Sequence, residues 1–250
     1  MLTPRIIPCL DVRDNVVMKG IKFKNLRELG SPAQLAQEYD AQGADEIMVL
    51  DISATNRRLP TQLLTIHEVR SAISIPLTVG GGIRCIDDIT RLTDAGADRV
   101  SINTAAFQTP ELVAQCSERF GKQCTVVAID ARRNGSNWEI CTHSGTNRTG
   151  KDVVEWAVTV EKLGAGEILL TSFDRDGTRT GYDCPLITAV TQAVGIPVIA
   201  SGGADNVTDL IDGLDAGAAA CLIASIIHDG DVTVKQLKQE LSDSGVEVRR

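Results

Sequence analysis

Short runs of Val, Ile and Leu alternate along this chain with longer segments of helical period. The runs carry few charges except near their ends, which is typical of parallel strands covered on both faces. The pattern predicts eight strands, over Arg5–Val12, Glu46–Asp51, Leu77–Gly80, Arg99–Asn103, Thr125–Asp130, Glu167–Ser172, Val198–Ser201 and Cys221–Ser225.

Helix signals lie between these runs. Ser31-Pro32 and Thr109-Pro110 each predict an N-cap followed by proline at the first helical position. A glycine of the kind that ends helices precedes several strands, at Gly43, Gly96, Gly164 and Gly217. The alternation predicts an α/β fold, a single (β/α)8 TIM barrel over residues 1–250. An open dinucleotide-binding sheet is disfavoured because no GxGxxG follows the first strand.

The chain also repeats itself at an offset of about 121 residues, roughly 1–121 and 122–242. The pair Gly81-Gly82 returns as Gly202-Gly203, and Asp11 has a counterpart in Asp130. Two half-barrels therefore each supply a glycine pair and a strand-end carboxylate. This predicts a pseudo-twofold site in which two acids work between two anion-binding pockets.

Charge and composition exclude several functions. The net charge of −8 argues against general nucleic-acid binding, and the apolar runs are too short to span a membrane. The chain opens without a secretory leader pattern, so we expect a cytoplasmic protein. Its seven cysteines include no CxxC pair and its three histidines lie far apart, which predicts reduced thiols and no metal site.

Two long segments leave the strand ends at which barrel active sites form: Arg13–Gly30 and Ala131–Lys151. We expect the first to be a long loop with several cations, which either serve the site or form a solvated surface. The second contains Asn134-Gly135 followed by partial alternation, which predicts a small hairpin over the barrel.

Asp11 and Asp130 are the first candidates for chemistry. Each ends an apolar strand, and the repeat places them across the barrel from each other. Of two facing acids, one can act as a general base and accept a proton while the other acts as a general acid and donates one. The alternative is that each merely caps a helix or pairs with a loop cation.

Glycine pairs after the third and seventh strands predict phosphate sites, because backbone N–H groups can approach an oxyanion closely there. A single pair would more often be a tight turn, but this arrangement occurs twice. The predicted substrate and phosphate residues are Gly81, Gly82, Asn103, Thr104, Ser144, Ser201, Gly202, Gly203, Ala224 and Ser225, with Thr171, Asp176 and Gly177 between the two phosphates.

Four charges of alternating sign stand near the starts of strands: Arg5, Glu46, Arg99 and Glu167. Physical reasoning alone favours an ion-pair ring that plugs the bottom of the barrel.

Several motifs together resemble the cyclase subunits of imidazole glycerol phosphate synthases, over essentially the whole chain. They are Arg5–Val12, Val17–Gly20, Thr78–Ile83, Ser101–Ala105, Val127–Asp130, Gly164–Ile168, Asp174–Gly177, Gly181–Asp183 and Ile199–Ala204. The resemblance implies a role in histidine biosynthesis, with no cofactor. A glutaminase partner, forming a heterodimer, releases ammonia that passes through the barrel to a bisphosphorylated ribulosyl substrate.

The resemblance also assigns roles. Asp11 and Asp130 become the acid–base pair, and Lys19 belongs to a first loop that closes on substrate. The lower ring becomes the ammonia gate, with Arg99 where lysine is usual, and Asp98 helps to dock the glutaminase. Three alternatives stay open: the sister isomerase of the same pathway, a paralogue with another ammonia acceptor, and a non-catalytic barrel that binds phosphorylated metabolites or scaffolds the glutaminase.

Overall fold

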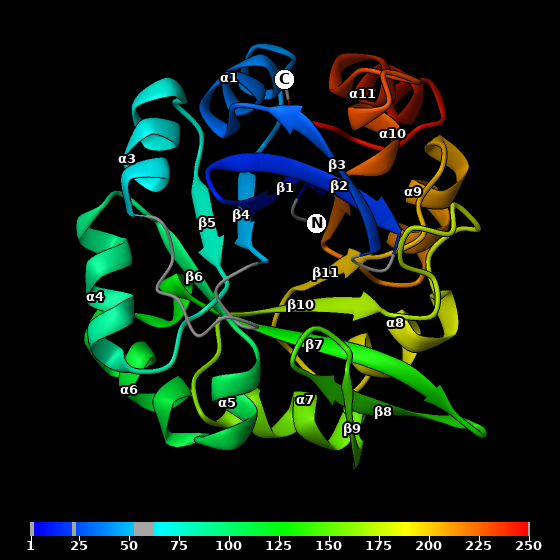
Figure 1. Ribbon diagram of the computed structural model, residues 1–250. Coiled ribbons are helices and arrows are strands. Elements are labelled where there is room, and N and C mark those ends of the chain that lie inside the picture. Colours follow the sequence, from blue (N-terminus) through cyan, green and yellow to red (C-terminus); the bar gives the residue numbers. More distant parts are fainter. Residues whose placement is uncertain (1–2, 22–23, 53–62, 250) are drawn as a thin grey trace.

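A closed barrel of eight parallel strands forms the centre of the molecule (Figure 1). This computed structural model describes residues 3–21, 24–52 and 63–249. The strands pair in the order β10-β11-β12-β1-β4-β5-β6-β7, and β7 pairs back with β10 to close the circle. All eight predicted strands are confirmed, with small shifts at their ends: β1 (Arg5–Arg13), β4 (Ile47–Asp51), β5 (Leu77–Gly80), β6 (Arg99–Ile102), β7 (Thr125–Asn134), β10 (Glu167–Ser172), β11 (Val198–Ser201) and β12 (Ala220–Ile223).

Helices form an outer ring around the strands (Figure 1). No helix in the described ranges is long and apolar enough to cross a bilayer. All seven cysteines are free, and five of them are buried. The helices are α1 (Pro32–Ala41), α3 (Leu63–Ala72), α4 (Ile86–Asp94), α5 (Thr104–Gln108), α6 (Glu111–Phe120), α7 (Val153–Lys162), α8 (Cys184–Thr191), α9 (Val207–Asp215), α10 (Ser225–His228) and α11 (Val234–Asp243), with a short 3-10 turn η1 (Lys122–Cys124).

The helix-end signals are mostly confirmed. Gly43, Gly96, Gly164 and Gly217 each lie one residue past a helix C-cap, with positive φ. The start predicted at Thr109-Pro110 is wrong by one residue, because Pro110 is itself the N-cap of α6. Thr109 closes the preceding helix α5 instead, where its N–H donates to the Ala105 carbonyl.

The segment expected as a long first loop is an antiparallel hairpin, β2 (Val16–Ile21) and β3 (Lys24–Gly30). It forms because β2 extends the ladder of β1, with Val12 opposite Val17, and because Val17 and Met18 are buried. The hairpin crosses the front of the barrel in Figure 1. The second hairpin is confirmed, with β7 and β8 (Asn137–Thr142) joined by a turn at Gly135, and β9 (Asn147–Asp152) beside β8.

Side-chain alternation divides the core into two layers. Along β1, Ile6 and Leu10 pack outward against the helices, whereas Ile7 and Cys9 point into the barrel. The inner layer is apolar and consists of Ile7, Cys9, Met48, Val126, Leu169, Ile199, Ala220 and Leu222. Arg5 and Asp11 continue the same alternation below and above this layer, roughly 20 Å apart along the strand. The barrel interior thus separates the charged ring from the acids.

Candidate active site

A cavity of about 830 Å³ lies at the carboxyl ends of the barrel strands. Its walls come from both halves of the repeat, and its floor includes the inner side chains Leu50, Ala128 and Leu222. The structure brings eleven of the predicted residues into this one cavity: Asp11, Gly81, Gly82, Asn103, Thr104, Asp130, Ser144, Thr171, Asp176, Ser201 and Ala224.

Asp11 lies near the end of β1 and faces the cavity. Burial and the nearby charge of Asp176 raise the pKa of its carboxyl to about 7, and a hydrogen bond from the Cys9 thiol works against that shift. The thiol sulfur lies 3.8 Å from Asp11 Oδ1. A carboxyl with this pKa is a proton donor or acceptor near neutral pH.

Asp130 lies on β7, across the barrel from β1. Burial raises the pKa of its carboxyl to about 6, a hydrogen bond from the Asn103 amide opposes the shift, and the charge of Asp176 adds to it. The Asn103 nitrogen donates to Asp130 Oδ2 at 3.0 Å. Both carboxyls therefore titrate near neutral pH, where they can exchange a proton with a bound ligand.

The first glycine pair follows β5 and lines the cavity. Gly81 has a φ of +96°, and a Cβ there would overlap the Asp51 backbone, so only glycine fits. The next wall begins at Asn103, the N-cap of α5. The Thr104 hydroxyl accepts a hydrogen bond of 3.0 Å from the His143 N–H, which fastens the β8–β9 connection to this wall.

The second glycine pair is built like the first but lies outside the cavity lining. Gly202 and Gly203 have positive φ, and the end of β10 packs against Gly202 as the end of β4 packs against Gly81. A Cβ on Gly203 would lie 3.0 Å from Arg175 Cβ, and one on Gly202 would lie 2.8 Å from the Ser172 carbonyl oxygen. Among the described residues, the cavity lining omits five predicted ones: Lys19, Gly177, Gly202, Gly203 and Ser225. Gly177, Gly202 and Ser225 each directly follow a residue of the lining. Gly203 follows Gly202.

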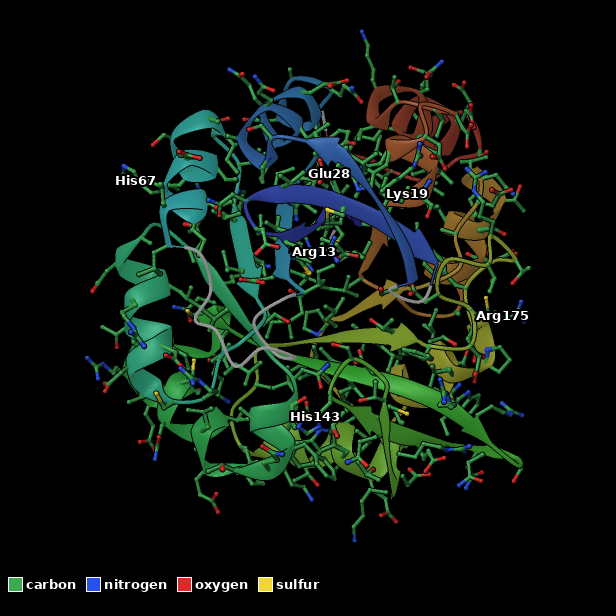
Figure 2. All side chains as sticks on the ribbon, in the orientation of Figure 1. Arg13, Lys19, Glu28, His67, His143 and Arg175 are labelled. Carbon is green, nitrogen blue, oxygen red and sulfur yellow. The ribbon has the colours of Figure 1, made fainter. Side chains whose placement is uncertain are left out.

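Lys19 points away from the cavity lining. Its ammonium pairs with the Asp229 carboxylate and donates to the Ser225 carbonyl oxygen at 3.3 Å. Burial, followed by the charges of Arg27 and Arg179, lowers its pKa. Figure 2 shows Lys19 on the α10 side of the barrel and His143 on the opposite side. In this structure Lys19 therefore belongs to the contact between the β2–β3 hairpin and α10.

The four predicted ring charges meet at the opposite end of the barrel. Arg5 lies 2.8 Å from Glu46 and also pairs with Glu167. One nitrogen of Arg99 bridges both acids, at 3.0 Å from Glu46 and 3.1 Å from Glu167. Burial raises the pKa of Glu167, although the charge of Arg5 opposes that shift. The ring is an ion-pair network of two cations and two anions.

The partly exposed Asp98 lies beside this ring. It accepts hydrogen bonds of 2.9 Å from Arg70 and from the Leu77 N–H. Its carboxylate thus faces the end of the barrel that carries the ring.

Comparison with known proteins places this architecture in a family. Residues 5–233 match the family described as "Histidine biosynthesis protein". The chain belongs to this family. It is 52% identical to the imidazole glycerol phosphate synthase subunit HisF of Metallosphaera sedula, over 250 residues that cover all of both chains. This full-length similarity supports the cyclase-subunit role in histidine biosynthesis, and the closed parallel barrel agrees with it.

In this family member, the sequence patterns missed several cavity residues, including Cys9, Arg84, Ser101 and His143. A signal for two of them was present. Cys9 stands two residues before Asp11 and Ser101 two residues after Arg99, so period-2 alternation places them on the inner face. Arg84 and His143 lie on connecting segments, where no such period applies. Within the described residues, no cluster of His, Cys, Asp and Glu is arranged to hold a metal ion.

Proposed function

We propose that this protein is the cyclase subunit of an imidazole glycerol phosphate synthase. It uses ammonia to convert a bisphosphorylated formimino-aminoimidazole-carboxamide ribulosyl nucleotide into imidazole glycerol phosphate and aminoimidazole carboxamide ribotide. The observation that carries the proposal is the pair of Asp11 and Asp130, which line one cavity with pKa values near neutrality. The full-length similarity to an imidazole glycerol phosphate synthase subunit supports the same reaction.

The proton states suggest how the two acids share the first step. Ammonia attacks the ribulosyl ketone carbon, and the new C–N bond forms as the carbonyl electrons move to oxygen. Asp11, the acid with the higher pKa, gives its proton to that oxygen, while Asp130 in its ionised form accepts a proton from the attacking nitrogen. Asn103 holds the Asp130 carboxylate in place for this transfer.

Two phosphates anchor the ligand on either side of the acids. One binds at the Gly81-Gly82 turn and the N-cap of α5, which already line the cavity. The other binds at the Gly202-Gly203 turn and the start of α10. The two helix starts are alike: the N-caps Asn103 and Ala224 share an unusual backbone, with φ/ψ of −111°/−98° and −140°/−72°. Lys19 lies beside this second pocket, where its ammonium donates to the Ser225 carbonyl oxygen.

The charged ring is proposed as the ammonia gate, and a glutaminase subunit as the partner that docks beneath it in a heterodimer. Arg99 bridges both glutamates, so ammonia passes only when this bridge opens. Asp98 is proposed as a docking contact because its carboxylate is half exposed beside the ring. Unchanged complex formation by Asp98→Ala in a pull-down with the glutaminase would remove Asp98 from the interface.

The direct test supplies the bisphosphorylated ribulosyl substrate with ammonium salt and measures imidazole glycerol phosphate. We expect ammonia-dependent product from this chain alone. Interconversion of ribosyl and ribulosyl isomers without ammonia would instead favour the sister isomerase. Binding of the substrate without any turnover would favour a non-catalytic barrel, although two carboxylates beside a bisphosphorylated ligand would weaken such binding.

A further inference from the structure

His228 is a partly buried histidine whose two ring nitrogens both have hydrogen-bond partners. It lies at the end of α10, where its Nε2 is 2.8 Å from the Cys9 carbonyl oxygen. Its Nδ1 is 2.6 Å from the hydroxyl of Tyr39 on α1. A carbonyl oxygen only accepts hydrogen bonds, so the contact with Cys9 places the ring hydrogen on Nε2. The Tyr39 hydroxyl then donates to Nδ1 and favours this tautomer.

The surroundings keep both rings in the form that these bonds require. Burial lowers the pKa of His228 to about 4. The hydrogen bond to the Cys9 carbonyl opposes that shift, whereas the charges of Lys19 and Arg27 add to it. Tyr39 is 3% exposed, and burial raises the pKa of its hydroxyl, which therefore keeps its hydrogen at neutral pH. The imidazole is thus neutral and has one donor and one acceptor.

The Cys9 carbonyl needs such a partner because the neighbouring strand has ended. Successive carbonyls of a strand face opposite edges, and that of Val12 faces β4, since it accepts from the N–H of the residue after β4. The Cys9 carbonyl, three residues earlier, therefore faces the β12 edge. However, β12 pairs with β1 only as far as Pro8. The His228 ring takes the place that β12 leaves open.

Asp11 depends on this stretch of β1 for its position. It lies two residues after Cys9, on the same inner face of the strand. Within the described residues, its carboxylate accepts a side-chain hydrogen bond only from the Cys9 thiol, at 3.8 Å. Asp130, in contrast, accepts directly from the Asn103 amide. The β1 backbone therefore sets the position of Asp11, and whatever holds the Cys9 carbonyl also holds this carboxyl.

The other half of the repeat is built differently at the corresponding place. The residue 121 positions before His228 is Phe107 on α5. It packs edge-on against Trp156 of α7, the helix that corresponds to α1, with ring centroids 5.5 Å apart. A phenyl ring offers no N–H to a strand carbonyl. The polar pair thus stands beside the strand of Asp11, the acid without an amide donor.

We propose that His228 is a positioning residue for Asp11. Oriented by the Tyr39 hydroxyl, it bonds the Cys9 carbonyl and fixes the end of β1 from which the Asp11 carboxyl faces the substrate. Neither His228 nor Tyr39 belongs to the described cavity lining, so both act through β1. This inference rests on the proposed function, because it takes Asp11 as one of the two acids.

The test is a double-mutant cycle on the ammonia-dependent rate, with His228→Phe made in the wild type and in Asp11→Asn. In the wild type, His228→Phe should lower kcat by a factor on the order of 10, because a misplaced catalytic group costs rate. The KM for the bisphosphorylated substrate should change less than about twofold, since no substrate contact is lost. In Asp11→Asn the same substitution should lower the rate less than about twofold, because the acid it positions is already gone.

Tyr39→Phe is the milder variant, because it removes a single oxygen. It should lower kcat about 3- to 10-fold in the wild type, the scale of one lost hydrogen bond, and less than about twofold in Asp11→Asn. Tyr182→Phe is the matched control. Tyr182 is 4% exposed and donates to the Leu222 carbonyl on β12 at 2.9 Å, so any loss of rate should be the same factor in both backgrounds. If His228→Phe fails to fold, Tyr39→Phe decides the question.

The imidazole ¹⁵N spectrum tests the tautomer without turnover. The signals of His228, identified by their loss in His228→Phe, should be those of a neutral Nε2–H ring at pH 7. A ring with its hydrogen on Nδ1, equal factors in both backgrounds for the folded variant, or an effect confined to the substrate KM overturns the inference while the proposed function stands. A wild-type chain that makes no product overturns both.

Discussion

At the scale of single residues, burial gives Asp11 and Asp130 their chemistry. Both carboxyls face the cavity, where losing water penalises the charged form, and the charge of Asp176 adds to that penalty. The partners differ: a thiol donates weakly to Asp11, whereas an amide donates to Asp130 at 3.0 Å. Both hydrogen bonds oppose the rise in pKa that burial causes.

Replacing either acid should impair catalysis. Asp11→Asn and Asp130→Asn are each expected to lower the ammonia-dependent rate by a factor on the order of 10² or more, the usual effect of losing a positioned acid or base. Product formation by purified variants with ammonium salt measures this. Near-normal turnover in either variant would remove that residue from the mechanism.

The same burial predicts a gain in stability. An unfolded aspartate titrates near pH 4, whereas the folded Asp11 carboxyl titrates at about 7, so ionising it above that pH costs folding free energy. Asp11→Asn should therefore raise the free energy of unfolding at pH 8 by about 4 kcal/mol, the equivalent of a shift of about three pKa units. The gain should shrink as the pH falls from 7 towards 4. Urea titrations across this range measure it, and a gain independent of pH would contradict the raised pKa.

Sequence alone identified both acids because strand ends and the repeat are visible in it. It missed Arg84 and His143 as cavity residues because both lie on connecting segments, where no strand or helix period applies. It could not anticipate that Lys19 pairs with Asp229, since this partner lies 210 residues away.

At the scale of elements, ion pairs join the β2–β3 hairpin to α10. Lys19 and Arg27 both pair with Asp229, which directly follows α10. Arg179, from the segment after β10, lies 3.9 Å from the same carboxylate. One acid therefore joins the hairpin, α10 and the β10 connection.

Removing this acid should loosen the hairpin. Asp229→Ala is expected to speed amide hydrogen exchange in β2 and β3 about fivefold, corresponding to roughly 1 kcal/mol for a network of partly exposed pairs. Exchange followed by mass spectrometry measures the effect. Asp215→Ala, an exposed aspartate on α9, is the control. Equal exchange in both variants would show that Asp229 does not hold the hairpin.

The element boundaries show why sequence reading succeeded in one place and failed in another. The strands and the helix C-termini were predictable because apolar runs and C-terminal glycines such as Gly43 are features of the local sequence. The β2–β3 hairpin was not predictable, because β2 is defined by its pairing with β1 and not by a pattern of its own side chains. The β7–β8 hairpin was predicted correctly, because its turn carries the local signal Asn134-Gly135.

At the scale of the whole molecule, an apolar layer separates a charged ring from an acidic cavity. The ring is closed because Arg5 and Arg99 both contact Glu46 and Glu167. Glu46 is 1% exposed and also accepts a hydrogen bond from Thr78, so it is the most enclosed of the four.

Breaking the ring should cost stability. Glu46→Ala leaves two arginines with one acid in the barrel, and is expected to lower the free energy of unfolding by about 3–5 kcal/mol. Urea unfolding against Glu240→Ala, an exposed control on α11, measures this. If Glu46→Ala lowers the free energy of unfolding no more than Glu240→Ala does, water or a rearranged side chain must take over the contacts of Glu46 with the two arginines.

The barrel and the four ring positions were predictable because the repeat and the strand starts are sequence features. The position of Gly202 and Gly203 outside the lining of the described cavity was not predictable, since the repeat gives both glycine pairs the same local signal.

The central claim is that two anion pockets flank two acids in one site. A crystal structure of this protein soaked with inorganic phosphate tests it most directly. The account predicts two phosphate ions, one at Gly81-Gly82 with Asn103-Thr104 and one at Gly202-Gly203 with Ala224-Ser225, with the Asp11 and Asp130 carboxyls between them. Phosphate in only one half of the barrel, or carboxyls turned away from the space between the ions, would contradict it.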